Sequence, residues 1–192
     1  MMHFDMLRLF DILLAIIVGI FTLPIQAFAL ALVWLTYGSN PIFVQERVGL
    51  DGKLFWLFKI KTMTDIVIDD DSNRVTFMGR YLRRSSIDEL PQILNVLLGD
   101  MSFVGPRPLT REILDNIQVP AETKLLRQQV RPGLTGLSQV MSKGKKRSQV
   151  EKFGFDVTWV RNKSIGLYLK ICLKTLKVLV VRYKNNIDAG SL

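Results

Sequence analysis

The stretch from Ile12 to Leu35 contains no charged side chain and consists mainly of apolar residues. It exceeds the roughly 20 residues that a helix needs to cross a lipid bilayer. Pro24 lies in its middle, where a proline removes one backbone hydrogen bond and clashes with the preceding turn. We therefore expect a membrane helix with a kink or a break at Pro24, and the nearby Gln26 offers a polar group to the freed backbone.

Three interpretations of this segment stay open on the residues alone. It could be a spanning helix, straight or kinked, or a re-entrant hairpin that enters and leaves by the same face with Pro24 as its elbow. It could also be a cleaved signal peptide, because Ala27-Phe28-Ala29 resembles a small-x-small cleavage site. The apolar run continues past that site to Leu35, which disfavours the signal peptide.

Length and composition narrow the chemistry of the whole chain. A chain of 192 residues suits one compact core with an appendage. The formal net charge of +9 favours anionic partners, namely nucleic acid, phosphorylated substrates or an anionic membrane face. The single Cys172 suits a reducing compartment. His3 is the one histidine, which disfavours Ser-His-Asp triads and the usual zinc sites, so carboxylates, lysines and arginines must carry any chemistry.

The chain after residue 37 has the composition of a soluble domain. Strands are expected at 42–47 and 54–63, joined as an antiparallel hairpin, and short helices at 77–84, 109–116 and 121–130. Lys59 and Lys61 are two residues apart and therefore share one strand face, where they contact either lipid headgroups or substrate.

Two charged runs are interpreted as solvated loops. Asp69-Asp70-Asp71 lacks the alternating ligands and the closing glutamate of an EF-hand calcium loop. The basic run from Lys143 to Arg147 has few interleaved aromatic residues, so no nucleic-acid partner is expected.

Residues 164–184 predict a long helix that carries Lys170, Lys174 and Lys177 on one face. Apolar residues occupy the remainder of its surface. The pattern is typical of a basic amphipathic helix in the membrane interface, with a buried core helix as the alternative.

The stretch from Ser85 to Pro108 holds the most promising constellation, the adjacent carboxylates Asp88 and Glu89. A structural explanation is a capping box, in which Ser86 caps a helix and Glu89 reaches back to it. Pro91 complicates this explanation, because as the first helical residue it would place both acids just outside the helix.

The same position suits a nucleophile. An ionised aspartate at the positive end of a helix can attack phosphorus and form an acyl phosphate. A neighbouring glutamate can then help to hold a divalent cation against a diphosphate. Arg107, fixed between two prolines, is preorganised for phosphate contact, and the glycine-containing loop that follows Arg131 could cradle a phosphate or be a plain turn.

Several separate motifs now support a family resemblance. The run DELPQILNVLLGDMSFVGPRPL, preceded by ERVG, FKIKTM and GRYLRRSS and followed by VRPGLTGLSQV, closely resembles the bacterial sugar transferases that act as polyprenol-phosphate phosphoglycosyl transferases. In particular, the chain is similar to the small monotopic members, and the resemblance covers about Phe4 to Lys184.

The resemblance implies roles for individual residues. Asp88 matches the catalytic nucleophile, and Glu89 matches the acid associated with Mg²⁺, so the two form the implied catalytic and metal pair. The residues that it implies in or near substrate binding are Arg83, Arg107, Arg131 and Asp156, and Lys59 joins this candidate set from its position on the strand face. Pro24 matches the membrane break, although similar members often have serine just before it, where this chain has Leu23.

The implied fold is mostly α with a small antiparallel β-hairpin. Residues 1–36 would form a re-entrant membrane helix, and residues 37–192 a cytoplasmic catalytic domain with interfacial amphipathic helices. The implied location is the bacterial inner membrane, with the active site on the cytoplasmic face.

The implied reaction transfers a phosphosugar from a UDP-sugar to undecaprenyl phosphate and releases UMP, as the first membrane step of surface glycan assembly. The expected partners are those two substrates, Mg²⁺ and the phospholipid membrane, and a homodimer stays open. Three alternatives also stay open: Asp88 as a general base in a ternary complex, a non-catalytic binder of anionic lipids, and a secreted basic protein.

Overall fold

A computed structural model describes residues 2–64, 74–142 and 147–189, and side chains from residue 6 to residue 180 within those ranges. The Asp69–Asp71 loop and most of the run from Lys143 to Arg147 lie outside the described residues. The helices are α1 (Met2–Tyr37), α2 (Phe77–Ser85), α3 (Gln92–Leu98), α4 (Arg111–Asn116), α5 (Ala121–Gln128), α6 (Leu137–Met141), α7 (Gln149–Asn162) and α8 (Ile165–Ala189). The strands are β1 (Ile42–Val48), β2 (Leu54–Ile60), β3 (Ser102–Val104) and β4 (Gly133–Thr135). The predicted class, mostly helical with a small antiparallel hairpin, is confirmed.

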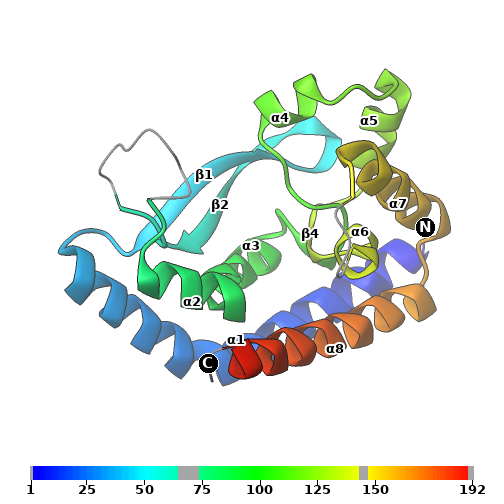
Figure 1. Cartoon of the computed structure of the whole chain (residues 1–192). Coiled ribbons are helices and arrows are strands. Elements are labelled where there is room, and N and C mark those ends of the chain that lie inside the picture. The colour runs from blue at the N-terminus through cyan, green and yellow to red at the C-terminus, as the bar shows by residue number, and fades with distance from the viewer. Residues whose placement is uncertain (1, 65–73, 143–146, 190–192) are drawn as a thin grey trace.

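Helix α1 continues through Pro24, and its two halves run in different directions in Figure 1. The Thr22 hydroxyl donates to the Val18 carbonyl at 2.7 Å, and Gln26 Nε2 donates to the Thr22 hydroxyl at 3.0 Å. The Gln26 side chain was expected to bond the backbone that Pro24 leaves free, but it bonds the Thr22 hydroxyl instead. A threonine that bonds the carbonyl four residues back favours helix bending, so Thr22 supports the bend that Pro24 causes.

The β1–β2 hairpin pairs from Ile42 opposite Ile60 to Val48 opposite Leu54. Strand β2 ends at Ile60, before the predicted Met63, because its partner strand begins only after Pro41, which has no N–H to donate. Residues opposite each other and two apart lie on the same face of the sheet, so Lys59 and Arg47 share one face.

A short parallel pair, β3 and β4, was not predicted. It brings the backbone of Gly105 against the glycine-containing loop: a Cβ on Gly133 would lie 2.0 Å from the Gly105 nitrogen, and a Cβ on Gly136 would lie 2.1 Å from the Gly105 oxygen. From the sequence, these glycines could allow the backbone to approach a ligand closely. The structure instead shows that the close approach is to the backbone that leads into Pro106.

The main core joins both ends of the chain. Ala15 of α1 is buried together with Val96, Trp159 and Ile171. Helices α1 and α8 lie along the lower side of the molecule in Figure 1. Helix α8 contributes to the core, because one side buries Tyr168 and Ile171, while the other side exposes an apolar stripe. That stripe consists of Leu169, Leu173, Leu176 and Val180. The predicted place of α8 in a membrane interface stays a prediction.

Among the described residues, one helical segment, Met6–Tyr37, is long and apolar enough to cross a membrane. Many of its large apolar side chains are exposed in the protein itself.

Candidate active site

The Asp88-Glu89 pair lies in a tight corner between α2 and α3. Helix α2 ends at Ser85, and the next residue, Ser86, has a left-handed φ of 59°. A single 3-10 turn over Ile87–Glu89 then leads through Pro91 into α3. The capping box does not form, since the Ser86 side chain makes no capping hydrogen bond. Asp88 and Glu89 therefore lie just outside α3, as expected if Pro91 stands at the start of that helix.

Glu89 is the centre of an ion-pair cluster. Its Oε1 lies 3.1 Å from Lys59 Nζ and 3.5 Å from Arg107 Nη2. Burial of Glu89 opposes ionisation, but Lys59 and Arg107 outweigh that effect and lower the pKa of Glu89 below its ordinary value. Glu89 is therefore ionised at neutral pH, and the predicted residues Lys59, Glu89 and Arg107 do come together.

Asp88 has a different environment although it is the next residue. Its side chain is 7% exposed, and its pKa is raised to about 6, first by burial and then by the charge of Glu89. Lys59 and Arg83 oppose that rise. At pH 7 most Asp88 carboxyl groups are therefore ionised, but they are more basic than a solvent-exposed aspartate, a property that suits a nucleophile or a base.

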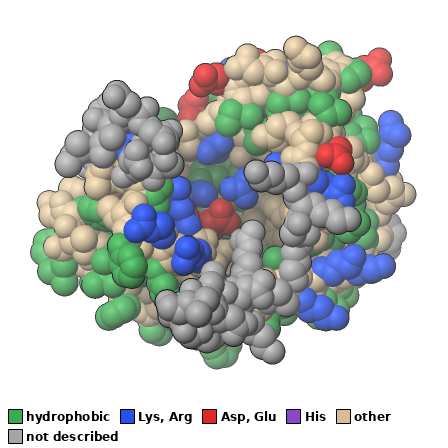
Figure 2. Space-filling model, viewed as in Figure 1, with side chains coloured by type: hydrophobic (Ala, Val, Ile, Leu, Met, Phe, Trp, Pro, Cys, Tyr) green, Lys and Arg blue, Asp and Glu red, His purple; other side chains and the backbone are tan. Residues whose placement is uncertain are grey.

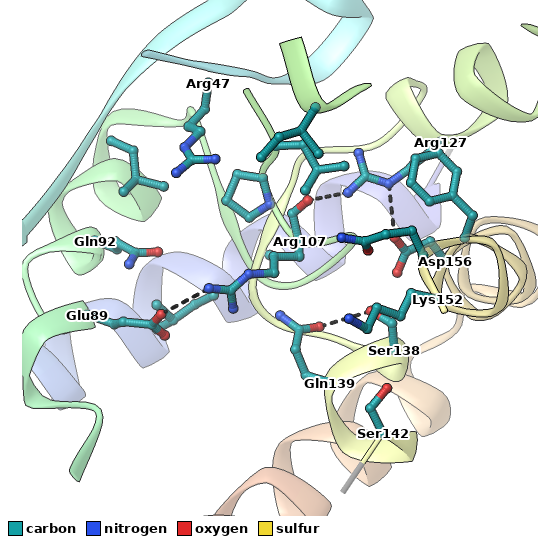
Figure 3. A pocket seen from close by; sticks show the side chains of 18 of the residues that line it. Arg47, Glu89, Gln92, Arg107, Arg127, Ser138, Gln139, Ser142, Lys152 and Asp156 are labelled. Carbon is teal, nitrogen blue, oxygen red and sulfur yellow. Dashed lines mark hydrogen bonds and ion pairs between the residues drawn. The ribbon is translucent and has the colours of Figure 1, made fainter. Parts of the chain in front are cut away.

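A pocket of about 670 Å³ opens beside this cluster. In Figure 2 basic side chains surround a hollow near the centre of the face, and acidic side chains lie among them. Figure 3 shows Glu89, Arg107, Gln139 and Asp156 lining the pocket. Glu89 lines the pocket, whereas Asp88, the preceding residue, is buried and is not among the lining residues.

Arg47 adds a second cation next to Arg107. Its pKa is lowered, first by burial and then by repulsion from Arg107. Its Nη2 bonds Gln45 at 2.5 Å, while its Nε is buried with no hydrogen-bond partner. Two neighbouring guanidinium groups that line one pocket form a ready site for an anion such as phosphate.

Arg107 itself stands on a rigid turn. The Gly133 N–H donates to the Pro106 carbonyl at 2.8 Å, and the Arg127 guanidinium donates to the Arg107 carbonyl. Arg127 in turn pairs with Asp156, at 2.9 Å between Nε and Oδ2, and both side chains are buried. The buried Arg127–Asp156 pair therefore supports the backbone that presents Arg107.

Asp156 was expected near the substrate, and the structure places it in the wall of the pocket. Burial raises its pKa, and the charge of Arg127 opposes that rise. One carboxylate oxygen, Oδ2, pairs with Arg127, while Oδ1 is buried and has no hydrogen bond of normal geometry to the described residues. The nearby Ser138 hydroxyl also helps to lower the pKa of Asp156. Asp156 therefore supports Arg127 and also offers an acceptor to the pocket.

Two of the predicted substrate-binding arginines lie outside this pocket. Arg83 donates from Nε to the Thr62 hydroxyl at 2.8 Å and is close enough to lower the pKa of Asp88. Arg131 donates from Nε to the Gly99 carbonyl at 2.7 Å and lies in a separate small cleft with Arg8 and Asp11. The structure thus brings Arg83 to Asp88 but does not bring Arg131 to the pocket.

Three residues that shape the site were not predicted from the sequence: Arg47, Arg127 and Asn95. Arg47 could have been found, since the period-two pattern of the hairpin places it on the same face as Lys59. Asn95 is fully buried and joins α3 to β2, because its amide donates to the Trp56 carbonyl at 2.7 Å and accepts from the Phe58 N–H at 3.2 Å. No sequence pattern pairs Arg127 with Asp156.

The acid pair also fits a magnesium ion. Mg²⁺ is commonly held by one or two carboxylates together with substrate phosphates, not by an all-protein cage. The described residues contain no group of three or more histidine, cysteine or acidic side chains placed to hold a metal. Asp88 and Glu89 supply the two carboxylates, and the cations beside them suit the phosphates.

Comparison with known proteins gives the family. The bacterial sugar transferase family model matches residues 2–182. The Bacillus subtilis protein named "Uncharacterized sugar transferase EpsL" is 44% identical over 191 residues, covering 95% of this chain and 93% of that protein. A UDP-glucose:undecaprenyl-phosphate glucose-1-phosphate transferase of Caulobacter vibrioides is 36% identical over 184 residues, covering 90% of this chain and 69% of that protein.

A protein of the same name from Klebsiella pneumoniae is 37% identical over 180 residues, covering 88% of this chain and 39% of that longer protein. The similarity spans the acid pair, the Pro-Arg-Pro turn and the apolar helix α1. The match over nearly the whole length shows that this chain belongs to the bacterial sugar transferase family.

Proposed function

We propose that this protein is a phosphoglycosyl transferase that moves a sugar phosphate from a UDP-sugar to undecaprenyl phosphate. The observation that carries the proposal is the cluster of Lys59, Glu89 and Arg107 at the mouth of a 670 Å³ pocket, with Asp88 buried beside it. The cations suit a diphosphate, and relatives named as undecaprenyl-phosphate sugar phosphate transferases support the choice of substrates.

The reaction has two displacement steps. In the first, an Asp88 oxygen forms a bond to the phosphorus that carries the sugar, and the bond from that phosphorus to the UMP oxygen breaks. In the second, an oxygen of the lipid phosphate forms a bond to the same phosphorus, and the bond to Asp88 breaks. The products are UMP and undecaprenyl-diphospho-sugar, and Asp88 is regenerated.

The surrounding residues have separate roles in this proposal. Arg107 and Arg47 bind the phosphate oxygens and orient the diphosphate. Lys59 holds Glu89 in place at 3.1 Å and keeps it ionised. Asp88 and Glu89 would hold Mg²⁺ together with the substrate phosphates, and the ion would supply neutralisation of the charge on the leaving UMP.

The membrane arrangement completes the proposal. Helix α1 would be re-entrant, with its bend at Pro24, and the exposed stripe of α8 would lie in the interface beside it. Both chain segments on either side of α1 would then remain on the cytoplasmic side. This arrangement brings a lipid-borne phosphate and a soluble UDP-sugar to one pocket.

The proposal is tested by incubating the purified protein with Mg²⁺, undecaprenyl phosphate and a panel of UDP-sugars while UMP is measured. We expect one donor to give UMP and a lipid-linked product. Asp88→Asn should abolish both, whereas Asp115→Asn, at an exposed position of α4, should retain them. UMP release by the Asp88→Asn protein at the rate of the unaltered protein would contradict the role of Asp88.

The order of the steps is tested by leaving out undecaprenyl phosphate. A covalent intermediate predicts a burst of UMP, up to one equivalent of enzyme, and radiolabelled sugar phosphate attached to the protein. If Asp88 is instead a general base in a ternary complex, no UMP appears until the lipid is added.

A further inference from the structure

The pocket has a second wall with unusual polar chemistry, formed by the end of α6 and by α7. Three of its buried polar atoms have no hydrogen-bond partner among the described residues: Gln139 Nε2, Ser142 Oγ and Asp156 Oδ1. Buried polar atoms are nearly always paired in folded proteins, so an unpaired set that lines one cavity wall indicates the position of a ligand.

The other polar atoms of two of these side chains are already engaged. Gln139 Oε1 accepts from the Ser138 hydroxyl at 3.3 Å, and Asp156 Oδ2 accepts from Arg127 at 2.9 Å. These contacts orient both groups. They leave the amide nitrogen of Gln139 without a hydrogen-bond partner among the described residues. The second Asp156 oxygen, Oδ1, has no hydrogen bond of normal geometry there either, although the Ser138 hydroxyl lies close enough to lower the pKa of Asp156.

The wall of α6 and α7 includes the cation Lys152, but its unpaired atoms differ in chemistry from the guanidinium groups of Arg47 and Arg107. It offers a donor from Gln139, an acceptor from Asp156, and a hydroxyl on Ser142 that can be either. A phosphate at neutral pH mainly accepts hydrogen bonds and would be repelled by the Asp156 carboxylate. A sugar hydroxyl both donates and accepts, so it matches the set.

The arrangement in space supports this division. Figure 3 shows Arg107 between Glu89 on one side and Gln139 and Asp156 on the other. A diphosphate bound at Arg107 would therefore place the group attached to it on the wall of α6 and α7. In a UDP-sugar that group is either the sugar or the uridine.

The aromatic content of the pocket favours the sugar. Phe153 is the aromatic residue among the described lining residues, and the Arg127 guanidinium already covers its ring at 4.9 Å from the centroid. A uracil ring would find no free aromatic face for stacking on this wall. Hydroxyl groups need only the unpaired donors and acceptors.

We propose that Gln139, Ser142 and Asp156 form a subsite for the sugar hydroxyls of the donor, and that Gln139 and Ser142 determine which hexose is accepted. This inference rests on the proposed function, because it assigns one part of the proposed substrate to one wall of the same pocket.

The test uses Gln139→Met and Ser142→Ala in the full-length protein, with Gln129→Met as a matched control at an exposed position of α5's end. UMP release is measured with UDP-glucose, UDP-galactose and UDP-N-acetylglucosamine, and UDP, which lacks the transferred hexose, is used as an inhibitor. Loss of one such hydrogen bond should reduce kcat/KM for the preferred donor about 5- to 20-fold and change the ratio between donors. Inhibition by UDP should change by less than about twofold, because the lost bond is to the sugar.

Two results would overturn the proposal. One is an equal loss of affinity for UDP and for the UDP-sugars, which would assign this wall to the nucleoside. The other is an unchanged preference among the three donors. The Gln129→Met protein should match the unaltered protein in every assay.

Failure of the proposed function has a different signature. In that case the unaltered protein releases no UMP from any donor. Direct binding of UDP-glucose and UDP to the unaltered protein and to Gln139→Met then decides the subsite: a loss confined to UDP-glucose supports it, and any other result contradicts it.

Discussion

Tyr168 in α8 donates a hydrogen bond of 2.8 Å to the Asp11 carboxylate in α1, although 157 positions separate them in the sequence. The same Asp11 oxygen accepts from the Ser102 hydroxyl and from the Phe103 N–H, both at 2.9 Å. This buried carboxylate therefore joins α1, α8 and β3. Strand β3 leads directly into the turn that carries Arg107, so Asp11 connects the apolar helix α1 to the pocket.

The Asp11 junction predicts a large loss of stability on substitution. Asp11→Ala removes the acceptor for three donors and leaves them buried, which should cost about 2–5 kcal/mol. Tyr168→Phe removes only one of the three bonds and should cost about 1 kcal/mol. Thermal unfolding in detergent measures both changes. Asp115→Ala, on the surface of α4, should have little effect, and an equally small effect of Asp11→Ala would contradict the prediction.

The raised pKa of Asp88 predicts that activity depends on pH. The carboxylate attacks only when it is ionised, so the rate of UMP release should increase as pH rises through about 6. Lys59 lowers the pKa of Asp88, so Lys59→Gln should move the midpoint of the profile to higher pH. The matched control is Lys61→Gln, since Lys61 contacts Ser39 at 3.3 Å and not the acid pair. A midpoint that is unchanged in Lys59→Gln would be evidence against this electrostatic coupling.

The buried Arg127–Asp156 pair predicts separate effects on stability and on activity. Arg127→Met leaves the Asp156 charge buried without its partner and should destabilise the fold by about 3–5 kcal/mol. Adding Asp156→Leu removes the unpaired charge and should restore part of that stability. It should not restore kcat/KM, because the Arg107 carbonyl still lacks its donor and the proposed sugar contact of Asp156 is lost as well.

The control for this pair is Arg147→Met. Arg147 pairs with Glu151 at 3.1 Å on the surface, where an ion pair contributes about 0–1 kcal/mol. Recovery of full activity in the Arg127→Met, Asp156→Leu protein would show that the pair does not position Arg107.

The proposed re-entrant path of α1 predicts that both ends of the helix face the same side of the membrane. In a re-entrant helix, Met6→Cys and Asn40→Cys should both react with an impermeant maleimide in inverted membrane vesicles. In a spanning helix only one of them would react. Burial raises the pKa of Cys172 to about 11, so the native thiol should stay largely unlabelled at neutral pH and serve as the control.

Pro24→Ala is the accompanying test of the bend. It restores an N–H at the middle of α1 and should favour a straighter helix. Labelling of the two cysteines from opposite sides in the Pro24→Ala protein would assign the re-entrant path to Pro24. If the two cysteines are labelled from opposite sides of the membrane in the protein that retains Pro24, the helix is not re-entrant.

The sequence by itself determined the features that depend on local composition and spacing. The uncharged run from Ile12 to Leu35 predicts an apolar helix, because a helix satisfies its backbone polar groups within one segment. The alternating pattern and turn residues near Gly49 dictate the hairpin, and Pro91 fixes where α3 begins. The family motifs alone identify Asp88 and Glu89 as the candidate catalytic pair.

The tertiary structure alone decided which charges meet. Lys59 and Arg107 reach Glu89 from 30 and 18 positions away, whereas Arg131, equally basic in the sequence, lies in a different cleft. The physical reason is that a charged side chain carries no local pattern that identifies its partner. Its partner is set by the packing of elements distant in the chain, and the same packing raises the pKa of Asp88 while it lowers that of Glu89.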